Sequence, residues 1–195
     1  VGTIDNSEIA AWAAEQGICL DRLQGKHEGF LLKVLGVGNK YRLAVLGSDK
    51  RGTAYGLMTL VRMMGVSPWQ WWADCEPTPR EVFQLEADFE RLEVPSVAYR
   101  GIFINDEDWG LNPWSSNNYE PKMRKRNGED STPRNGEIGP YTHERIFELL
   151  LRLRANIFWP AMHECTVPFY LIKGNKEVAD KYGILISTSH CEPMM

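Results

Sequence analysis

Apolar and polar positions follow different periods in the two parts of this 195-residue chain. Up to residue 92 the pattern mixes helical and strand periods, whereas from residue 96 it runs strand, long loop, helix, strand, helix, strand. Strands that alternate with helices at this spacing predict a parallel sheet with crossover helices. We therefore expect an α/β protein with a small α/β domain in residues 1–92 and a second domain in residues 96–195.

The first part predicts two helices and a hairpin. Residues 7–15 form a helix candidate with Ser7 as its cap, and two apolar runs, residues 29–35 and 41–46, are separated by glycines, as in a hairpin. Asp49 then precedes a strongly periodic helix that should end at Gly65. The face expected to pack carries Ala54, Leu57, Met58, Val61 and Met64.

The second part predicts two further helices after a long polar loop. Residues 143–154 carry leucines at helical spacing, with Thr142 as a suitable start, and a shorter helix over residues 176–181 leads through Gly183 into the third strand. Residues 109–140, rich in Asn, Gly and Pro, are expected to be a loop of the long kind that is functional or mobile. A short basic run inside it is typical of a solvated segment, although it could attract an anionic substrate; it comprises Lys122, Arg124, Lys125 and Arg126.

Carboxylates and imidazoles follow the end of each strand in the second part. The carboxyl ends of parallel strands meet at one rim of a β/α fold, where enzymes of this architecture place their chemistry. Paired carboxylates can act as general acid and base, while imidazole and carboxylate groups can grip sugar hydroxyls, coordinate a divalent ion or make structural hydrogen bonds. The residues concerned are Asn105, Asp106, Glu107, His163, Glu164, His190 and Glu192, and Trp159 offers a flat face for stacking on a sugar.

Composition removes several function classes. A net charge of −4 argues against nucleic acid as the main partner, and no apolar run is long enough to span a bilayer. The four cysteines form neither a CxxC pair nor a dense disulfide pattern. Because Val1 follows no initiator Met and Met195 comes where a third strand should lead into a helix, we expect a fragment of a longer polypeptide.

Several long motifs in this order resemble glycoside hydrolase family 115, the xylan α-1,2-glucuronidases. They are residues 99–107 (YRGIFINDE), 146–162 and 182–194, with residues 47–57 and 67–74 resembling the helper domain of that family. The resemblance covers nearly the whole chain, although residues 120–137 are an extra stretch. It implies that the second domain contains the first three strands of a (β/α)₈ TIM-type barrel.

The resemblance also implies a reaction: removal of glucuronic acid or its 4-O-methyl form from glucuronoxylan, with inversion and without a cofactor or metal. The implied catalytic candidates are Glu107, Asp106 and Glu164, and the implied substrate contacts are Asn105, His163, His190, Glu192 and Trp159. Further strands beyond Met195 would carry essential groups, so the chain alone should be inactive. A non-catalytic carbohydrate-binding module and a metal-dependent TIM-barrel hydrolase remain alternatives.

The expected substrate also indicates where the protein acts and what it binds. Xylan is extracellular or imported as oligosaccharides, so a secreted or periplasmic protein is expected. Its partners would be glucuronoxylan or its oligosaccharides and the rest of the same polypeptide, without nucleic acid or membrane. A homodimer is possible.

Overall fold

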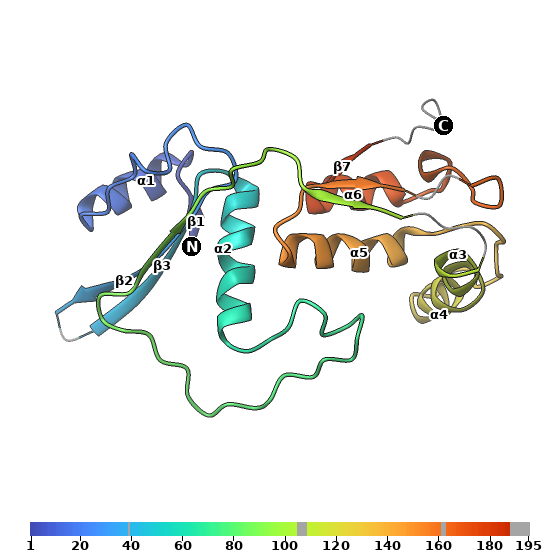
Figure 1. The fold of residues 1–195 in the computed structure, drawn as a ribbon, viewed down its shortest axis with the longest axis horizontal. Helices are drawn as coiled ribbons and strands as arrows, with labels where there is room; N and C mark the ends of the chain where they lie inside the picture. Colours follow the sequence, from blue (N-terminus) through green and yellow to red (C-terminus); the bar gives the residue numbers. More distant parts are fainter. Residues whose placement is uncertain (39, 105–108, 161–162, 188–195) are drawn as a thin grey trace. The chain divides into compact units, whose positions relative to one another are not determined.

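The structure is a computed structural model that describes residues 1–38, 40–104, 109–160 and 163–187 (Figure 1). The chain divides into two compact units, Val1–Ala98 and Tyr99–Met195. Both units combine helices with a sheet, so the expected α/β class is confirmed.

The first unit is built on a four-stranded mixed sheet. Its strand order is β1 (Gly2–Thr3), β3 (Lys40–Gly47), β2 (Phe30–Val37) and β4 (Glu90–Glu93). The antiparallel pair β2 and β3 confirms the predicted hairpin. Strand β4 was not predicted, because Leu92 is its only apolar residue; it lies at the sheet edge, where Glu90 forms ion pairs with Lys33 and Arg22.

Helices α1 (Ser7–Glu15) and α2 (Lys50–Met63) belong to the first unit, and Figure 1 shows them beside its strands. The prediction that Ser7 caps α1 is wrong: the side chain of Asn6 accepts the N–H groups of Glu8 and Ile9 at 2.9 and 3.1 Å. An amide oxygen at the cap position satisfies two otherwise unpaired N–H groups. Asp49, which the sequence placed just before α2, is its cap: its side chain accepts the Gly52 N–H at 2.8 Å.

The predicted packing face of α2 is also wrong. Leu57 and Met64 are 38% and 47% exposed, whereas the buried positions of the helix are Gly52, Tyr55, Gly56 and Thr59. A Cβ built on Gly56 would lie 3.0 Å from the Val45 side chain, so this helix approaches the sheet through its smallest residues. Close backbone approach selects glycine, and an analysis of apolar periodicity does not detect it.

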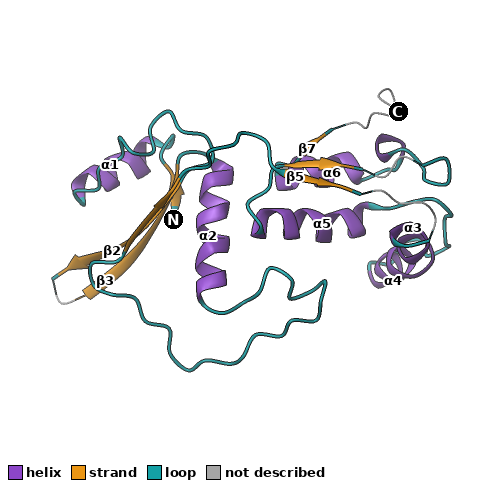
Figure 2. Ribbon diagram, viewed as in Figure 1, coloured by secondary structure: helices purple, strands orange, loops and turns teal. Residues whose placement is uncertain are grey.

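The second unit contains three parallel strands in the order β5 (Gly101–Phe103), β6 (Ile157–Trp159) and β7 (Leu185–Ile186). Helices α5 (Pro140–Arg152) and α6 (Asn175–Tyr182) link them, which confirms the predicted alternation of parallel strands and helices (Figure 2). Helix α5 begins at Pro140 rather than at Thr142. Its core contacts are aromatic: Phe147 meets Phe158 of β6 edge to face at 5.5 Å, and the His143 ring lies 4.8 Å from Phe169.

Residues 111–126 are helical, so the prediction of a long loop over residues 109–140 is wrong for this half, whereas residues 127–139 contain no helix or strand. The segment contains α3 (Leu111–Trp114), a π-helical turn (Ser115–Tyr119) and α4 (Glu120–Arg126); a 3₁₀ turn (Phe169–Leu171) follows β6. We refer to residues 111–137 as the excursion. The buried side chains of the excursion are polar, so its amino-acid composition resembles that of a loop. These side chains are Asn112, Ser115, Ser116, Glu120 and Arg124.

Candidate active site at the ends of the parallel strands

The three parallel strands end at the same edge of their sheet. Phe103 of β5 pairs in register with Trp159 of β6, and Ile102 and Phe158 are level with Ile186 of β7. The register continues by hydrogen bonds from the Ile104 N–H to the Trp159 carbonyl at 3.0 Å and from the Ser187 N–H to the Phe158 carbonyl at 2.9 Å. Since the chain leaves all three strands at this edge, the expected convergence of the strand ends is confirmed.

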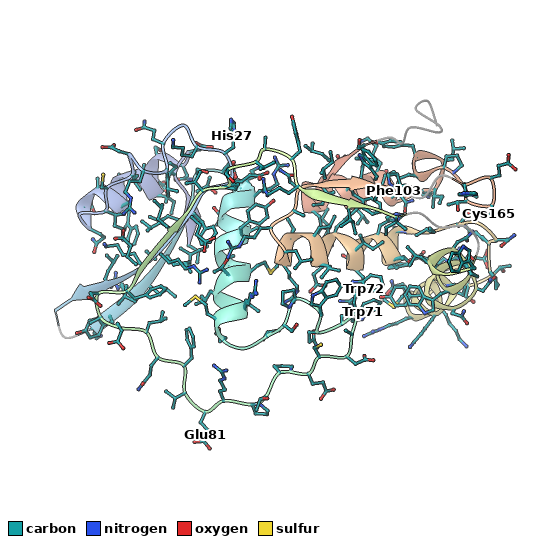
Figure 3. All side chains as sticks on the ribbon, viewed as in Figure 1. His27, Trp71, Trp72, Glu81, Phe103 and Cys165 are labelled. Carbon is teal, nitrogen blue, oxygen red and sulfur yellow. The ribbon has the colours of Figure 1, made fainter. Side chains whose placement is uncertain are left out.

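An aromatic pair marks this edge. The rings of Phe103 and Trp159 meet edge to face with centroids 5.8 Å apart, and each side chain is more than one third exposed. Phe103 is labelled in Figure 3 at the end of β5. An aromatic ring that remains open at a strand end can pack against the apolar face of a sugar. The substrate contact of Trp159 stays a prediction.

His163 and Glu164 form an exposed turn after β6. The carbonyl of His163 accepts the Thr166 N–H at 2.8 Å, which closes the turn. Cys165, labelled in Figure 3, follows as a half-buried thiol. Both predicted side chains thus stand on one short turn, accessible from solvent, where an imidazole and a carboxylate can reach hydroxyl groups of a ligand.

The other predicted site residues lie outside the described residues. They are Asn105, Asp106 and Glu107, which follow β5, and His190 and Glu192, which follow β7. What the structure brings together is therefore the strand ends that carry them, together with Trp159, His163 and Glu164. Over the described part of the chain, no group of three or more His, Cys, Asp or Glu side chains is placed to hold a metal ion.

The excursion contributes a buried polar network that the sequence did not suggest. Glu120, 2% exposed, accepts the Thr142 N–H at 2.6 Å and the Thr142 hydroxyl at 2.8 Å. The Ser115 hydroxyl lies 2.7 Å from that of Thr142. Burial raises the pKa of the Glu120 carboxyl above its usual value, although the hydrogen bonds from Thr142 oppose this shift. The carboxyl caps the first turn of α5, so the excursion is joined to a core helix.

Both ends of the excursion are also connected with the turn after β6. The side chain of Asn112 donates to the Cys165 carbonyl at 3.1 Å, and the Val167 N–H donates to the Gly136 carbonyl at 2.8 Å. Asn112 is fully buried. The sequence contains no pattern that predicts these contacts. The structure shows why position 136 is a glycine: its φ is 81°, in the left-handed region that favours glycine.

A charged cavity of about 570 Å³ lies elsewhere in the second unit, between α4, the first turn of α5 and α6. Among its lining residues are Glu120, Arg124 and Tyr141. Trp159, His163 and Glu164, the described members of the predicted site, do not line it. The arrangement at the strand ends, rather than this cavity, therefore defines the candidate active site.

In β/α folds the catalytic groups lie at the carboxyl ends of the parallel strands, and a glycoside hydrolase uses acidic groups that flank a bound sugar. A family model agrees: that of Glycosyl hydrolase family 115 matches residues 92–195, more than half of the chain. The chain belongs to this family, as its motifs indicated.

A solved structure supports the assignment over the whole chain. It is that of a family GH115 4-O-methyl-α-glucuronidase, BtGH115A, with specificity for decorated arabinogalactans; it is 55% identical and superimposes with a TM-score of 0.87. The match covers 100% of this chain and 24% of that one, so the present chain spans about a quarter of that protein. A comparison with curated proteins found no match. Over the described residues, no helix is long and apolar enough to cross a membrane.

Proposed function

We propose that this chain is part of an α-glucuronidase that removes glucuronic acid or 4-O-methylglucuronic acid from the side chains of a plant polysaccharide. The observation that carries the proposal is the meeting of three parallel strand ends in a chain of family 115, each strand followed by acidic or imidazole side chains. A relative that is 55% identical is described as a 4-O-methyl-α-glucuronidase, which supports the same bond and the same sugar.

The barrel is part of this proposal. Three strands form an open sheet, and four of its apolar side chains are 37% to 42% exposed: Ile102, Phe103, Trp159 and Leu185. A parallel sheet is normally buried on both faces. We therefore propose that β5, β6 and β7 are the first strands of a (β/α)₈ barrel, and that groups on later strands complete the site, so that residues 1–195 alone are inactive.

Inversion assigns two different roles to carboxylates in this site. One carboxylic acid protonates the glycosidic oxygen, and a carboxylate about 6.5–9.5 Å away activates water on the opposite face of the sugar. Asp106, Glu107 and Glu164 are our candidates for these roles. Trp159 would stack on the sugar, while Asn105, His163, His190 and Glu192 would contact its hydroxyl or carboxyl groups. No metal or other cofactor enters this mechanism.

Two polysaccharides are candidate substrates. The motifs favour glucuronoxylan, whereas BtGH115A is specific for decorated arabinogalactans. Both polymers lie outside the cell or enter it as oligosaccharides, so we propose that the protein is secreted or periplasmic. We also propose that its partners are these glycans and the remainder of its own polypeptide, with a homodimer as a further possibility.

The test is an assay of the complete polypeptide on both polysaccharides. We expect release of free uronic acid, and NMR of the first product should show the β-anomer, since inversion converts an α-linkage into a β-hemiacetal. Glu107→Gln and Asp106→Asn should lower kcat by at least about a hundredfold, the usual effect of losing general acid or base catalysis. Glu81→Gln, an exposed carboxylate labelled in Figure 3, is the matched control. Lack of uronic acid release from both polymers would refute the activity, and an α-anomer would refute inversion.

A further inference from the structure

The turn that carries His163 and Glu164 has little support from its own strand. Strand β6 ends at Trp159, and both side chains are exposed. A solvent-exposed turn of this kind moves readily unless other elements hold it. A group that must meet a sugar within a few tenths of an ångström needs such support.

The excursion supplies two attachments on either side of the turn's last residues. Asn112 donates from its side chain to the Cys165 carbonyl at 3.1 Å, and the Gly136 carbonyl accepts the Val167 N–H at 2.8 Å. The attachment at Gly136 is close: a Cβ there would lie 2.7 Å from the Cys165 carbonyl oxygen. The backbone of residues 165–167 is thus held from both arms of the excursion.

The excursion itself is anchored. Ser116 donates its hydroxyl to the Asn112 carbonyl at 2.9 Å, which fixes the backbone that carries the amide. Glu120 accepts two hydrogen bonds from Thr142 in the first turn of α5, a helix whose core face is fully buried. A continuous set of buried polar contacts therefore runs from α5 through the excursion to the turn.

We propose that Asn112 is a positioning residue for the candidate active site, which holds the His163–Glu164 turn through the Cys165 carbonyl. This inference rests on the proposed function, because the turn matters for activity only if His163 and Glu164 serve the sugar. Asn112 does not itself need to touch the substrate. Its contribution is to keep the turn in one conformation while the sugar binds.

The first test is independent of activity and uses the thiol beside the contact. Cys165 is a half-buried thiol that forms no disulfide among the described residues, and the exposed thiols Cys19 and Cys75 are internal references. In the complete polypeptide, Asn112→Leu should raise the iodoacetamide alkylation rate of Cys165, read by mass spectrometry, by about tenfold, the effect of losing one buried hydrogen bond. The rates of the two reference thiols should stay unchanged.

Matched variants make the result specific. Asn117→Leu changes an exposed asparagine of the same excursion and should leave the Cys165 rate unchanged. Gly136→Ala disturbs the second attachment and should raise the Cys165 rate as well. If Asn112→Leu does not fold, Asn112→Ser, which is too short to reach the Cys165 carbonyl, replaces it, with the same expected rise and the same refuting result. An unchanged Cys165 rate in folded Asn112→Leu would overturn the inference.

The second test connects the turn with catalysis. Asn112→Leu should lower kcat/KM for uronic acid release by about tenfold, and the same change in a background that carries both His163→Gln and Glu164→Gln should have no further effect, because Asn112 acts through these two side chains. Additive effects would mean that Asn112 acts elsewhere and would overturn the inference. A wild-type protein that releases no uronic acid would instead overturn the proposed function. The alkylation rate of Cys165 would then still show whether Asn112 holds the turn.

Discussion

His143 should make the second unit sensitive to mild acid. The side chain lies in the first turn of α5, 3% exposed, with rings of Phe147, Phe158 and Phe169 around it. Its Nδ1 is 3.0 Å from the Gly139 carbonyl. Burial lowers the pKa of His143 to about 4, although the contacts with Gly139 and Asn175 oppose this shift.

The sign and size follow from the difference in protonation between the folded and unfolded chains. An unfolded histidine titrates near pH 6.5, so between pH 6.5 and 4 the unfolded chain binds a proton that folded His143 does not. Stability is therefore complete above about pH 6.5 and falls as the pH drops through this window. At pH 5 the loss is about 2 kcal/mol, or about 30-fold in the opening equilibrium.

Hydrogen exchange of the α5 amides, corrected for intrinsic rates, measures this equilibrium for the second unit. Protection over residues 140–152 should fall by about 20-fold between pH 7 and pH 5 in the wild type beyond any fall in His143→Gln, because the unfolded histidine is already partly protonated at pH 7. The subtraction is needed because Glu120, whose pKa is raised, changes stability in the opposite direction. The exposed His27 offers a matched control, His27→Gln. Equal pH dependence in wild type and His143→Gln would refute the reasoning.

Two further predictions concern stability. Glu120→Ala should destabilise the second unit by about 1–3 kcal/mol, because it removes the acceptor of the Thr142 N–H and hydroxyl. Glu120→Gln keeps an acceptor oxygen and should destabilise the unit less. Equal losses of unfolding free energy for the two variants in urea denaturation would contradict this prediction. Gly52→Ala should destabilise the first unit by about 3 kcal/mol, since its Cβ would overlap the Gly29 carbonyl, while Gly36→Ala meets only an ordinary contact with Tyr41 and serves as control in thermal denaturation.

The sequence was sufficient for elements whose pattern is local. The hairpin of β2 and β3 follows from two apolar runs around a glycine turn. The helix predicted over residues 176–181 is α6 (Asn175–Tyr182), and Gly183, with φ 64°, ends it on the way to the third strand. The parallel order β5, β6, β7 follows from the alternation of strands and helices. These features need no information about distant residues, so one sequence can predict them.

Features that depend on distant partners could not be predicted. The packing face of α2 is chosen by how closely Gly52 and Gly56 allow the sheet to approach, not by its apolar stripe. In the same way the composition of the excursion predicted a loop, because nothing in the sequence shows that Glu120 will meet Thr142 or that Asn112 will meet Cys165. The candidate residues at the strand ends could be predicted from where each strand ends in the sequence. The groups that support them could be identified only from the folded structure.

Polar support suits this edge of the sheet for a physical reason. Strands β5 and β6 have three residues each, so the sheet offers few hydrogen bonds at this edge. In the proposed site this rim admits water and a polar sugar, so an apolar brace would expose its surface there. The buried amide of Asn112 avoids this cost, because its hydrogen bond to the Cys165 carbonyl is directional and pairs a polar group. The buried polar residues of the excursion are therefore better understood as part of the site's construction than as an irregular loop.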